Sequence, residues 1–206
     1  MKLYLSDIKI HKIIAGLDEA GRGSWAGPVV AGCVVITEDD LINKQEKLQQ
    51  LLPQVKDSKV LLPAKREELF EIILKNFIWG VGVVSAGVID KIGIGNAVKQ
   101  AMRLAVRKTR VKPQLLLVDY YSNIGLPLKT KGITKGDANV FCIAAASIIA
   151  KVYRDRLMFK YGKRFNFWQF SQNKGYGTAK HRQLLKVYGL SPIHRRSFAP
   201  MKFLDK

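Results

Sequence analysis

Two short apolar runs near the start of the chain, residues 13–17 and 29–36, are rich in β-branched side chains and predict two strands of one sheet. The segment that joins them, LDEAGRGSWAGP, carries two adjacent acids, Asp18 and Glu19, and then a glycine-rich loop. A turn needs at most one of these acids, and Asp18 taken alone fits an ordinary turn position. Two acids together at the end of a buried strand indicate chemistry as well as a turn.

The rest of the chain alternates apolar runs with helix-forming segments. Further strands are expected at residues 77–85, 114–118 and 128–134, and the second of these, QLLLV, is fully apolar and therefore central. Helices are expected at residues 65–76, 88–110, 138–161 and 181–188, and residues 39–54 are polar and helix-permissive. This order predicts a mixed α/β sheet with helices packed on it.

The charge is unusual for a globular chain of 206 residues, because 35 Lys and Arg face 16 Asp and Glu, a net of +19. Such a surplus attracts polyanions, and nucleic acid is the first candidate, although a basic ribosomal-type surface has the same composition. From Ala138 onward 14 Lys and Arg face two Asp, so affinity for a duplex should fall steeply with salt. Candidate phosphate contacts, each with a solvated surface charge as the alternative, are Arg154, Lys174, Lys180 and Arg182.

The cysteines and the N-terminal residues bear on the compartment. Cys33 and Cys142 lie in apolar stretches and are expected to be buried thiols, which fits a reducing environment. The first twelve residues carry charges and no long apolar run, so no signal peptide is expected. No apolar run approaches the ~20 residues that a membrane span needs. We therefore expect a cytoplasmic protein with no membrane contact.

Two further acids stand where a sheet could gather them with Asp18 and Glu19. Asp119 directly follows the 114–118 strand, at the carboxyl end where active-site groups of α/β sheets usually lie, although a turn residue is the alternative. Asp137 precedes the alanine-rich helix, where a plain N-cap is the alternative. Four close carboxylates would repel one another and raise their pKa values, and a pair of divalent cations relieves that repulsion. Two such ions about 4 Å apart can clamp a phosphodiester that is being hydrolysed.

Other kinds of site are disfavoured by the spacing of their residues. His11, His181 and His194 show no zinc-site spacing, and the chain has no CxxC. It has no GxxxxGK[ST] phosphate loop, and Gly93-Ile94-Gly95 lacks the third glycine of a dinucleotide fingerprint. A Ser/His/Asp triad is compatible with the composition, but there is no GxSxG elbow.

The motifs DEAGRG, AGPVVAG, DSK, KREEL, KGDA, IAAASIIAKVYRD, KGYGT and HRRSF follow one another across nearly the whole chain. As a set they resemble the ribonuclease HII family. The resemblance implies a ribonuclease H-like α/β fold, with a five-stranded mixed sheet flanked by helices and a C-terminal helical segment. It also implies an endonuclease that hydrolyses the RNA strand of RNA/DNA hybrids and cuts 5′ of ribonucleotides embedded in duplex DNA, leaving a 5′-phosphate and a 3′-hydroxyl.

The resemblance further implies roles for individual residues. The catalytic and metal-binding acids would be Asp18, Glu19, Asp119 and Asp137, with two Mg²⁺ or Mn²⁺ ions. The ribonucleotide and its 2′-hydroxyl would meet the loop Gly21, Arg22 and Gly23, a phosphate would meet Lys59, and the sugar at the RNA–DNA junction would meet Tyr176. Because the 2′-hydroxyl alone distinguishes RNA from DNA at a given sugar, a glycine loop that lets the backbone approach closely suits its recognition.

Three features depart from the family's pattern. Tyr120 and Tyr121 follow the third acid, where glycine is usual, and Ser24-Trp25 replaces a small or aliphatic pair after GRG. Residues 39–55 form a longer segment than expected, which we interpret as a surface insertion. The short stretch before the first strand favours ribonuclease HII over the related ribonuclease HIII. We expect a monomer, with a catalytic domain at residues 1–160 and a basic helical segment at 161–206 packed on it.

Two alternatives stay open at this point. One is a non-catalytic basic protein that binds nucleic acid, and the other is a different nuclease on the same fold, such as a resolvase. Only an enzyme needs four convergent acids, and only the other nuclease would cut all-DNA branched substrates.

Overall fold

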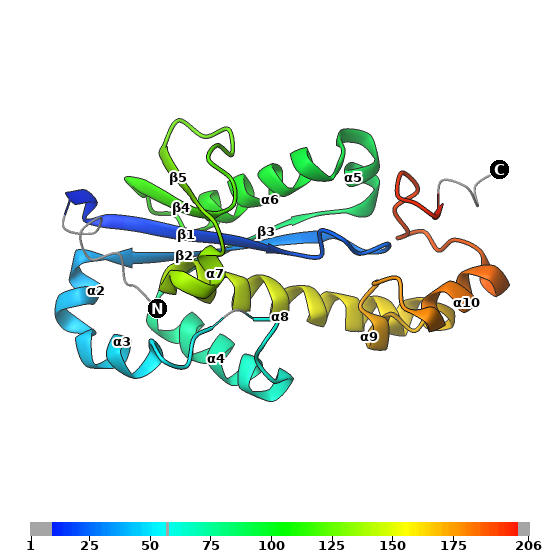
Figure 1. Ribbon diagram of the computed structural model, residues 1–206, viewed down its shortest axis with the longest axis horizontal. Helices are drawn as coiled ribbons and strands as arrows, with labels where there is room; N and C mark the ends of the chain where they lie inside the picture. The colour runs from blue at the N-terminus through cyan, green and yellow to red at the C-terminus, as the bar shows by residue number, and fades with distance from the viewer. Residues whose placement is uncertain (1–9, 57, 202–206) are drawn as a thin grey trace.

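The protein is built on one five-stranded sheet in the computed structural model, which describes residues 10–56 and 58–201 (Figure 1). The strands follow the spatial order β3-β2-β1-β4-β5. Their bounds are β1 (Ile13–Ala20), β2 (Val29–Thr37), β3 (Ile78–Val84), β4 (Leu115–Asp119) and β5 (Lys129–Ile133). Antiparallel pairs join β1 to β2 and β2 to β3, whereas parallel pairs join β1 to β4 and β4 to β5. The mixed sheet and its five strands confirm the predicted fold class.

The register between β1 and β4 brings two of the predicted acids together. Leu17 of β1 pairs with Val118 of the parallel strand β4, so the next residues along each strand are Asp18 and Asp119. Both acids therefore stand at neighbouring positions at the same edge of the sheet. On its other side, Asp18 pairs with Gly32 of β2.

Helices cover both faces of the sheet. One face carries α5 (Ala86–Ile92) and α6 (Ile94–Lys108), and α6 packs on β3 and β2. The long helix α8 (Phe141–Arg164) runs along the other face against β1 and β2 (Figure 1). Alternate residues of β1 supply the two cores, with Ile14 facing α8 and Ala15 facing α6.

Close approach of α8 to the sheet depends on two glycines. A Cβ added at Gly16 would lie 2.3 Å from the carbonyl carbon of Cys142, and one at Gly32 would lie 2.3 Å from the carbonyl oxygen of Ala146. Any larger residue would push the helix away from β1 and β2. The same helix also lies beside the carboxyl end of β1, where Asp18 stands.

The remaining helices of the described residues lie beside α8 or at its ends. They are α2 (Glu38–Asn43), α3 (Gln45–Leu51), α4 (Pro63–Asn76), α7 (Gly136–Asn139), the short η1 (Asn166–Trp168), α9 (Phe170–Asn173) and α10 (Ala179–Tyr188). The segment predicted as an insertion forms α2 and α3, whose Leu48 and Leu51 join the core under α8. The segment predicted as one helix at residues 88–110 is divided, because Gly93, with a φ of 77°, separates α5 from α6.

Beyond α8, the C-terminal residues form a small core of their own. Trp168, Phe170 and Leu185 from η1, α9 and α10 pack with Met158 of α8 and with Ala26 of the glycine-rich loop. The loop after β1 is therefore part of this C-terminal core, so the sheet edge and the C-terminal helices are built as neighbours.

Both cysteines are buried free thiols, as predicted, and burial raises the pKa of Cys142 to about 12. In the part of the chain that the structure describes, no helix combines the length and apolarity needed to cross a bilayer.

Candidate active site

Asp18 lies at the buried end of β1 with only 5% of its surface exposed. Its Oδ1 accepts a hydrogen bond from the backbone N–H of Glu19 at 2.7 Å. Burial raises the pKa of Asp18 well above its ordinary value, and the charges of Glu19, Asp119 and Asp137 raise it further. These mutual effects on one carboxyl group show that the four predicted acids share one region of the sheet edge.

Asp119 and Asp137 are joined through a backbone contact. The N–H of Gly136, the first residue of α7, donates to Oδ1 of Asp119 at 2.8 Å. Lys135 before it adopts a left-handed backbone, with φ of 53°, and this turn directs α7 toward the end of β4. Asp137 follows and is 7% exposed. The turn therefore holds the third and fourth acids beside each other.

Two cations lie among the acids. Nη1 of Arg22 is 3.8 Å from Oε1 of Glu19, and Nζ of Lys59 is 3.5 Å from Oδ2 of Asp137. Burial raises the pKa of Glu19, while Arg22 and then Lys59 oppose that rise. The two side chains thus offset part of the carboxylate repulsion, and both are among the residues predicted to contact substrate.

The donor set suits a hard divalent cation, since four carboxylates supply oxygen ligands. Within residues 10–56 and 58–201, no three His, Cys, Asp or Glu side chains already lie in a metal-binding arrangement. Glu19 instead faces Arg22, and Asp137 faces Lys59. A metal ion at this edge would compete with these two cations for the carboxylates.

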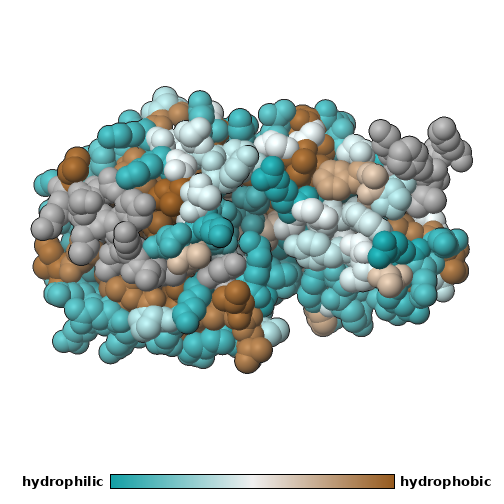
Figure 2. All heavy atoms as spheres, in the orientation of Figure 1, coloured by the Kyte–Doolittle hydropathy of each residue, from teal (hydrophilic) through white to brown (hydrophobic). Residues whose placement is uncertain are grey.

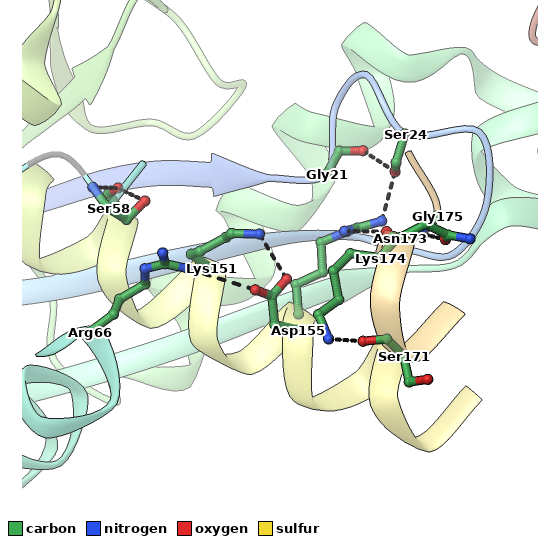
Figure 3. Close-up of polar contacts among 12 residues, drawn as sticks. Gly21, Ser24, Ser58, Arg66, Lys151, Asp155, Ser171, Asn173, Lys174 and Gly175 are labelled. Atoms are coloured by element: carbon green, nitrogen blue, oxygen red, sulfur yellow. Dashed lines mark hydrogen bonds and ion pairs between the residues drawn. The ribbon is translucent and has the colours of Figure 1, made fainter. Parts of the chain in front are cut away.

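Lys59 is presented by a loop that is tied to α8. Ser147 of α8 donates from Oγ to Oγ of Ser58 at 2.7 Å, and its Oγ also accepts from the backbone N–H of Ser58 at 3.3 Å (Figure 3). Ser58 is buried, whereas the side chain of Lys59 is 73% exposed. Asp57, the first residue of the DSK motif, lies outside the described residues.

The two glycines of the predicted sugar loop are constrained differently. Gly21 has a φ of 90°, and a Cβ there would lie 1.9 Å from Nε of Arg154. A Cβ at Gly23 would meet no atom within 4 Å. Gly21 is therefore required by the fold, whereas the protein itself gives no reason for glycine at position 23, where the loop surface is open.

A buried arginine holds the inner side of this loop. Nη2 of Arg195 donates to the carbonyl of Gly21 at 2.7 Å, and its Nη1 donates to the carbonyl of Arg22 at 2.9 Å. Oγ of Ser24 also donates to the Gly21 carbonyl, at 2.9 Å. Because these carbonyls point inward, the loop has a fixed backbone before any substrate binds.

Tyr176 lies close to two cations of α8. Nζ of Lys151 is 5.8 Å and Cζ of Arg154 is 5.4 Å from the centre of its ring, which is within cation–π range. Its loop is a tight turn in which Oδ1 of Asn173 accepts from the N–H of Gly175 at 2.7 Å (Figure 3). Tyr176 is 36% exposed, so part of the ring is open to a ligand.

Ser24 and Trp25 join the sugar loop to the tyrosine loop. Trp25 donates its N–H to the carbonyl of Gly175 at 2.8 Å, and its indole covers Gly177, where a Cβ would lie 2.3 Å from the ring. Its ring also lies 5.7 Å from that of His181. This departure from the family's pattern therefore serves packing between the two loops.

The tyrosine pair after Asp119 is accommodated in two ways. Tyr120 has a φ of 68°, which explains why glycine is usual there, and its side chain is 72% exposed. The ring of Tyr121 lies 5.6 Å from the guanidinium of Arg22. Tyr121 thus supports the arginine that faces Glu19.

One predicted phosphate contact is wrong. Arg154 is fully buried and donates to oxygen atoms inside the protein, because α8 turns this position toward the glycine-rich loop instead of solvent. Nζ of Lys174 donates to the carbonyl of Ser171. Lys180 and Arg182 are exposed on α10, as the prediction for them requires.

A histidine pair was not found from the sequence. The N–H of Ser191 donates to Nδ1 of His194 at 2.8 Å, so the proton of this ring lies on Nε2. Nε2 of His194 therefore donates to Nε2 of His181 at 2.9 Å. Nδ1 of His181 in turn donates to the carbonyl of Tyr176 at 2.9 Å. Burial lowers the pKa of His181, and burial and its partner lower that of His194 to about 3. Both rings are neutral and support the tyrosine loop.

The surface around these elements suits a polar ligand. The face of the molecule drawn in Figure 2 is mostly hydrophilic, with scattered hydrophobic side chains. The C-terminal residues contribute a large share of the positive charge of the whole chain.

Comparisons with known proteins agree on one family. The family model described as Ribonuclease HII matches residues 15–201. A protein of Dehalococcoides mccartyi with the name Ribonuclease HII is 48% identical over 92% of this chain and 87% of its own length. The solved ribonuclease H2 of Pyrococcus horikoshii has a TM-score of 0.76 and 30% identity, with 94% of this chain and 97% of that chain covered.

A more distant structure supports the fold alone. Bst-RNase HIII in complex with Mn²⁺ has a TM-score of 0.70 at 17% identity, with 98% of this chain and 72% of that chain covered.

Proposed function

The chain belongs to the ribonuclease HII family, whose members are metal-dependent RNase H endonucleases acting on RNA/DNA hybrids, and on that premise we propose a finer function and its residues. The enzyme cuts 5′ of single ribonucleotides embedded in duplex DNA, as well as the RNA strand of hybrids. The products carry a 5′-phosphate and a 3′-hydroxyl. We assign residues 1–160 to the catalytic domain and residues 161–206 to a basic segment that binds the duplex, and the protein acts as a monomer.

Four acids are proposed to hold two Mg²⁺ or Mn²⁺ ions: Asp18, Glu19, Asp119 and Asp137. When bound, such ions supply an activated water and stabilise the leaving 3′-oxygen. The observation that carries the assignment is the neighbouring placement of Asp18 and Asp119 on parallel strands, with the pKa of Asp18 raised by its burial and then by the other three acids. A cluster of carboxylates is costly to ionise without cations, and metal ions bound among the carboxylates remove that cost.

Lys59 and Arg22, which offset part of the carboxylate repulsion, are also proposed to contact the substrate. Lys59 is 73% exposed at its side chain and reaches Asp137 only at 3.5 Å, so it can leave that carboxylate when a metal ion replaces it. It then faces solvent at the sheet edge, where a phosphate of the cut strand would lie. Arg22 makes a similarly loose contact with Glu19 at 3.8 Å and rests on the ring of Tyr121.

Sugar selection is assigned to the loop of Gly21, Arg22 and Gly23 together with Tyr176. The open space at Gly23 allows a ribose to approach the backbone closely, which suits a contact with its 2′-hydroxyl. Tyr176 offers a partly exposed ring to the neighbouring sugar.

The test uses two substrates, an RNA/DNA hybrid and a DNA duplex with one ribonucleotide, each with Mg²⁺ or Mn²⁺. Wild-type protein and the control variant Asp155→Asn should nick both, whereas Asp137→Asn should nick neither and still bind them. Asp155 of α8 is a suitable control because it pairs with Lys151 of the same helix and with Arg66 of α4. Cleavage of an all-DNA branched duplex, or nicking by Asp137→Asn at the wild-type rate, would contradict the proposal.

A further inference from the structure

Arg154 is a charged residue with no exposed surface. Its guanidinium donates to oxygen atoms of the protein in several directions, at distances between 2.7 and 3.1 Å. The acceptors are the carbonyls of Pro28 (2.9 Å), Lys174 (3.0 Å) and Ala26 (3.1 Å) and Oγ of Ser24 (2.7 Å). A planar guanidinium with five N–H donors can satisfy this set, and a lysine ammonium with three cannot.

These acceptors belong to two loops with one task in the proposed function. Ser24, Ala26 and Pro28 lie in the glycine-rich loop that begins at Gly21, whereas Lys174 lies in the loop that carries Tyr176. Figure 3 shows Ser24 and Gly21 on one side of this network and Lys174 and Gly175 on the other. One side chain therefore bridges the two loops assigned to the ribose and to the neighbouring sugar.

Arg154 also touches the recognition groups themselves. Its Nε would lie 1.9 Å from a Cβ at Gly21, so the glycine rests directly on the side chain. Its Cζ is 5.4 Å from the centre of the Tyr176 ring. A movement of this guanidinium would therefore change the position of Gly21 and of the tyrosine together.

The direct partners of the Arg154 guanidinium are neutral oxygen atoms, and the charge of Asp155 on the same helix acts on it from further away. Neither Arg154 nor Arg195 forms an ion pair with a carboxylate of the described residues. Burial of two cations is costly unless their N–H groups are hydrogen-bonded, and here oxygen atoms of the two loops accept those bonds. The guanidinium of Arg195 donates to the carbonyls of Gly21, Arg22 and Gly27, which belong to the same loop.

We propose that Arg154 is a positioning residue that fixes the spacing between the Gly21–Gly23 loop and Tyr176, and so determines specificity for a ribonucleotide–deoxyribonucleotide junction. This inference rests on the proposed function of those two loops. A duplex with a single ribonucleotide can be cut in only one position on the enzyme, in which both loops contact the same junction. A continuous hybrid has a ribose at every position. A variant with an altered distance between the two loops can therefore still bind it in a position that allows cleavage.

The experiment measures kcat and KM of Arg154→Lys on the single-ribonucleotide duplex and on the hybrid. On the single-ribonucleotide duplex we expect kcat/KM to fall on the order of 10²-fold, which is the scale of a misplacement of about 1 Å. On the hybrid the loss in kcat/KM should be at least ten times smaller. Arg156→Lys is the matched control, because Arg156 lies on the same helix but faces Glu67 and Glu71 at the surface. It should leave both rates at the wild-type level.

Two further variants separate positioning from folding. Ser24→Ala removes a single acceptor of Arg154, so it should show the same substrate preference in weaker form, even where Arg154→Lys fails to fold. The double variant Arg154→Lys with Tyr176→Ala should be no worse on the single-ribonucleotide duplex than Tyr176→Ala alone.

Equal losses on both substrates, no loss in either Arg154→Lys or Ser24→Ala, or additive effects in the double variant would overturn the inference. Wild-type protein that nicks no single-ribonucleotide duplex would instead overturn the proposed function, so the two failures are distinguishable.

Discussion

Replacement of Asp18 by asparagine should stabilise the metal-free protein while it abolishes activity. The carboxylate is 5% exposed, and its pKa is raised first by burial and then by Glu19. Burial of one ion carries a penalty of several kcal/mol, of which the hydrogen bond from the backbone N–H of Glu19 offsets a part. Asparagine removes the charge but keeps an oxygen to accept from the N–H of Glu19. We expect a net gain of about 2 kcal/mol.

That gain converts to a measurable shift in the thermal midpoint. For 206 residues the entropy of unfolding is about 0.43 kcal/mol per kelvin, so about 2 kcal/mol raises Tm by about 5 °C. The assay is thermal unfolding at neutral pH in EDTA and again in several millimolar MgCl₂. Wild-type protein should gain stability from Mg²⁺, and Asp18→Asn should gain much less.

The stability difference between Asp18→Asn and wild type should depend on pH. A carboxyl group whose pKa is raised on folding stabilises the protein below its unfolded pKa, and that contribution is lost as pH rises through the folded pKa. The advantage of Asp18→Asn should therefore shrink as the solution is acidified below neutral pH. Asp155→Asn, which breaks ion pairs with Lys151 and Arg66, should lower Tm instead. A lower Tm for Asp18→Asn in EDTA would refute the reasoning.

Three further predictions concern the loops and the acids. Gly23→Ala should leave the free energy of unfolding within about 0.5 kcal/mol of wild type, because a Cβ there meets no atom, yet reduce cleavage of the single-ribonucleotide duplex at least tenfold; unchanged kcat/KM would count against a sugar contact. Tyr120→Gly should raise the free energy of unfolding by up to about 1 kcal/mol by relieving its left-handed backbone, as chemical denaturation would report, and a loss of stability would contradict this. Cleavage should decline as pH falls through the raised pKa values of Asp18 and Glu19, and a higher Mg²⁺ concentration should move the midpoint of that decline to lower pH; a midpoint independent of metal would argue against direct binding.

Much of the fold and the acidic site could be predicted because local patterns carry them. The apolar run before Asp119 gave a central strand, and an acid directly after such a strand must lie at its carboxyl edge. The neighbouring placement of Asp18 follows from the parallel pairing of β1 with β4. Strand order was not predicted, because it depends on contacts between residues far apart in the chain.

The buried polar residues were harder to predict for a physical reason. Arg154 lies in a basic stretch where exposed and buried arginines look alike, and its partners are mostly carbonyls, which every residue has. The contact of His181 with His194 also depends on the fold of the C-terminal helices. Residues whose partners are backbone atoms leave no pattern in the sequence, and here these residues shape the loops.

The most direct test of the account is cleavage of a DNA duplex with one ribonucleotide, compared with the same duplex carrying deoxyribose or 2′-O-methylribose at that position. With Mg²⁺ or Mn²⁺ we predict a single nick 5′ of the ribonucleotide, with a 3′-hydroxyl and a 5′-phosphate at the ends, and none in the two analogues. A nick in the deoxyribose duplex, or no nick in the ribonucleotide duplex with either metal, would contradict the account.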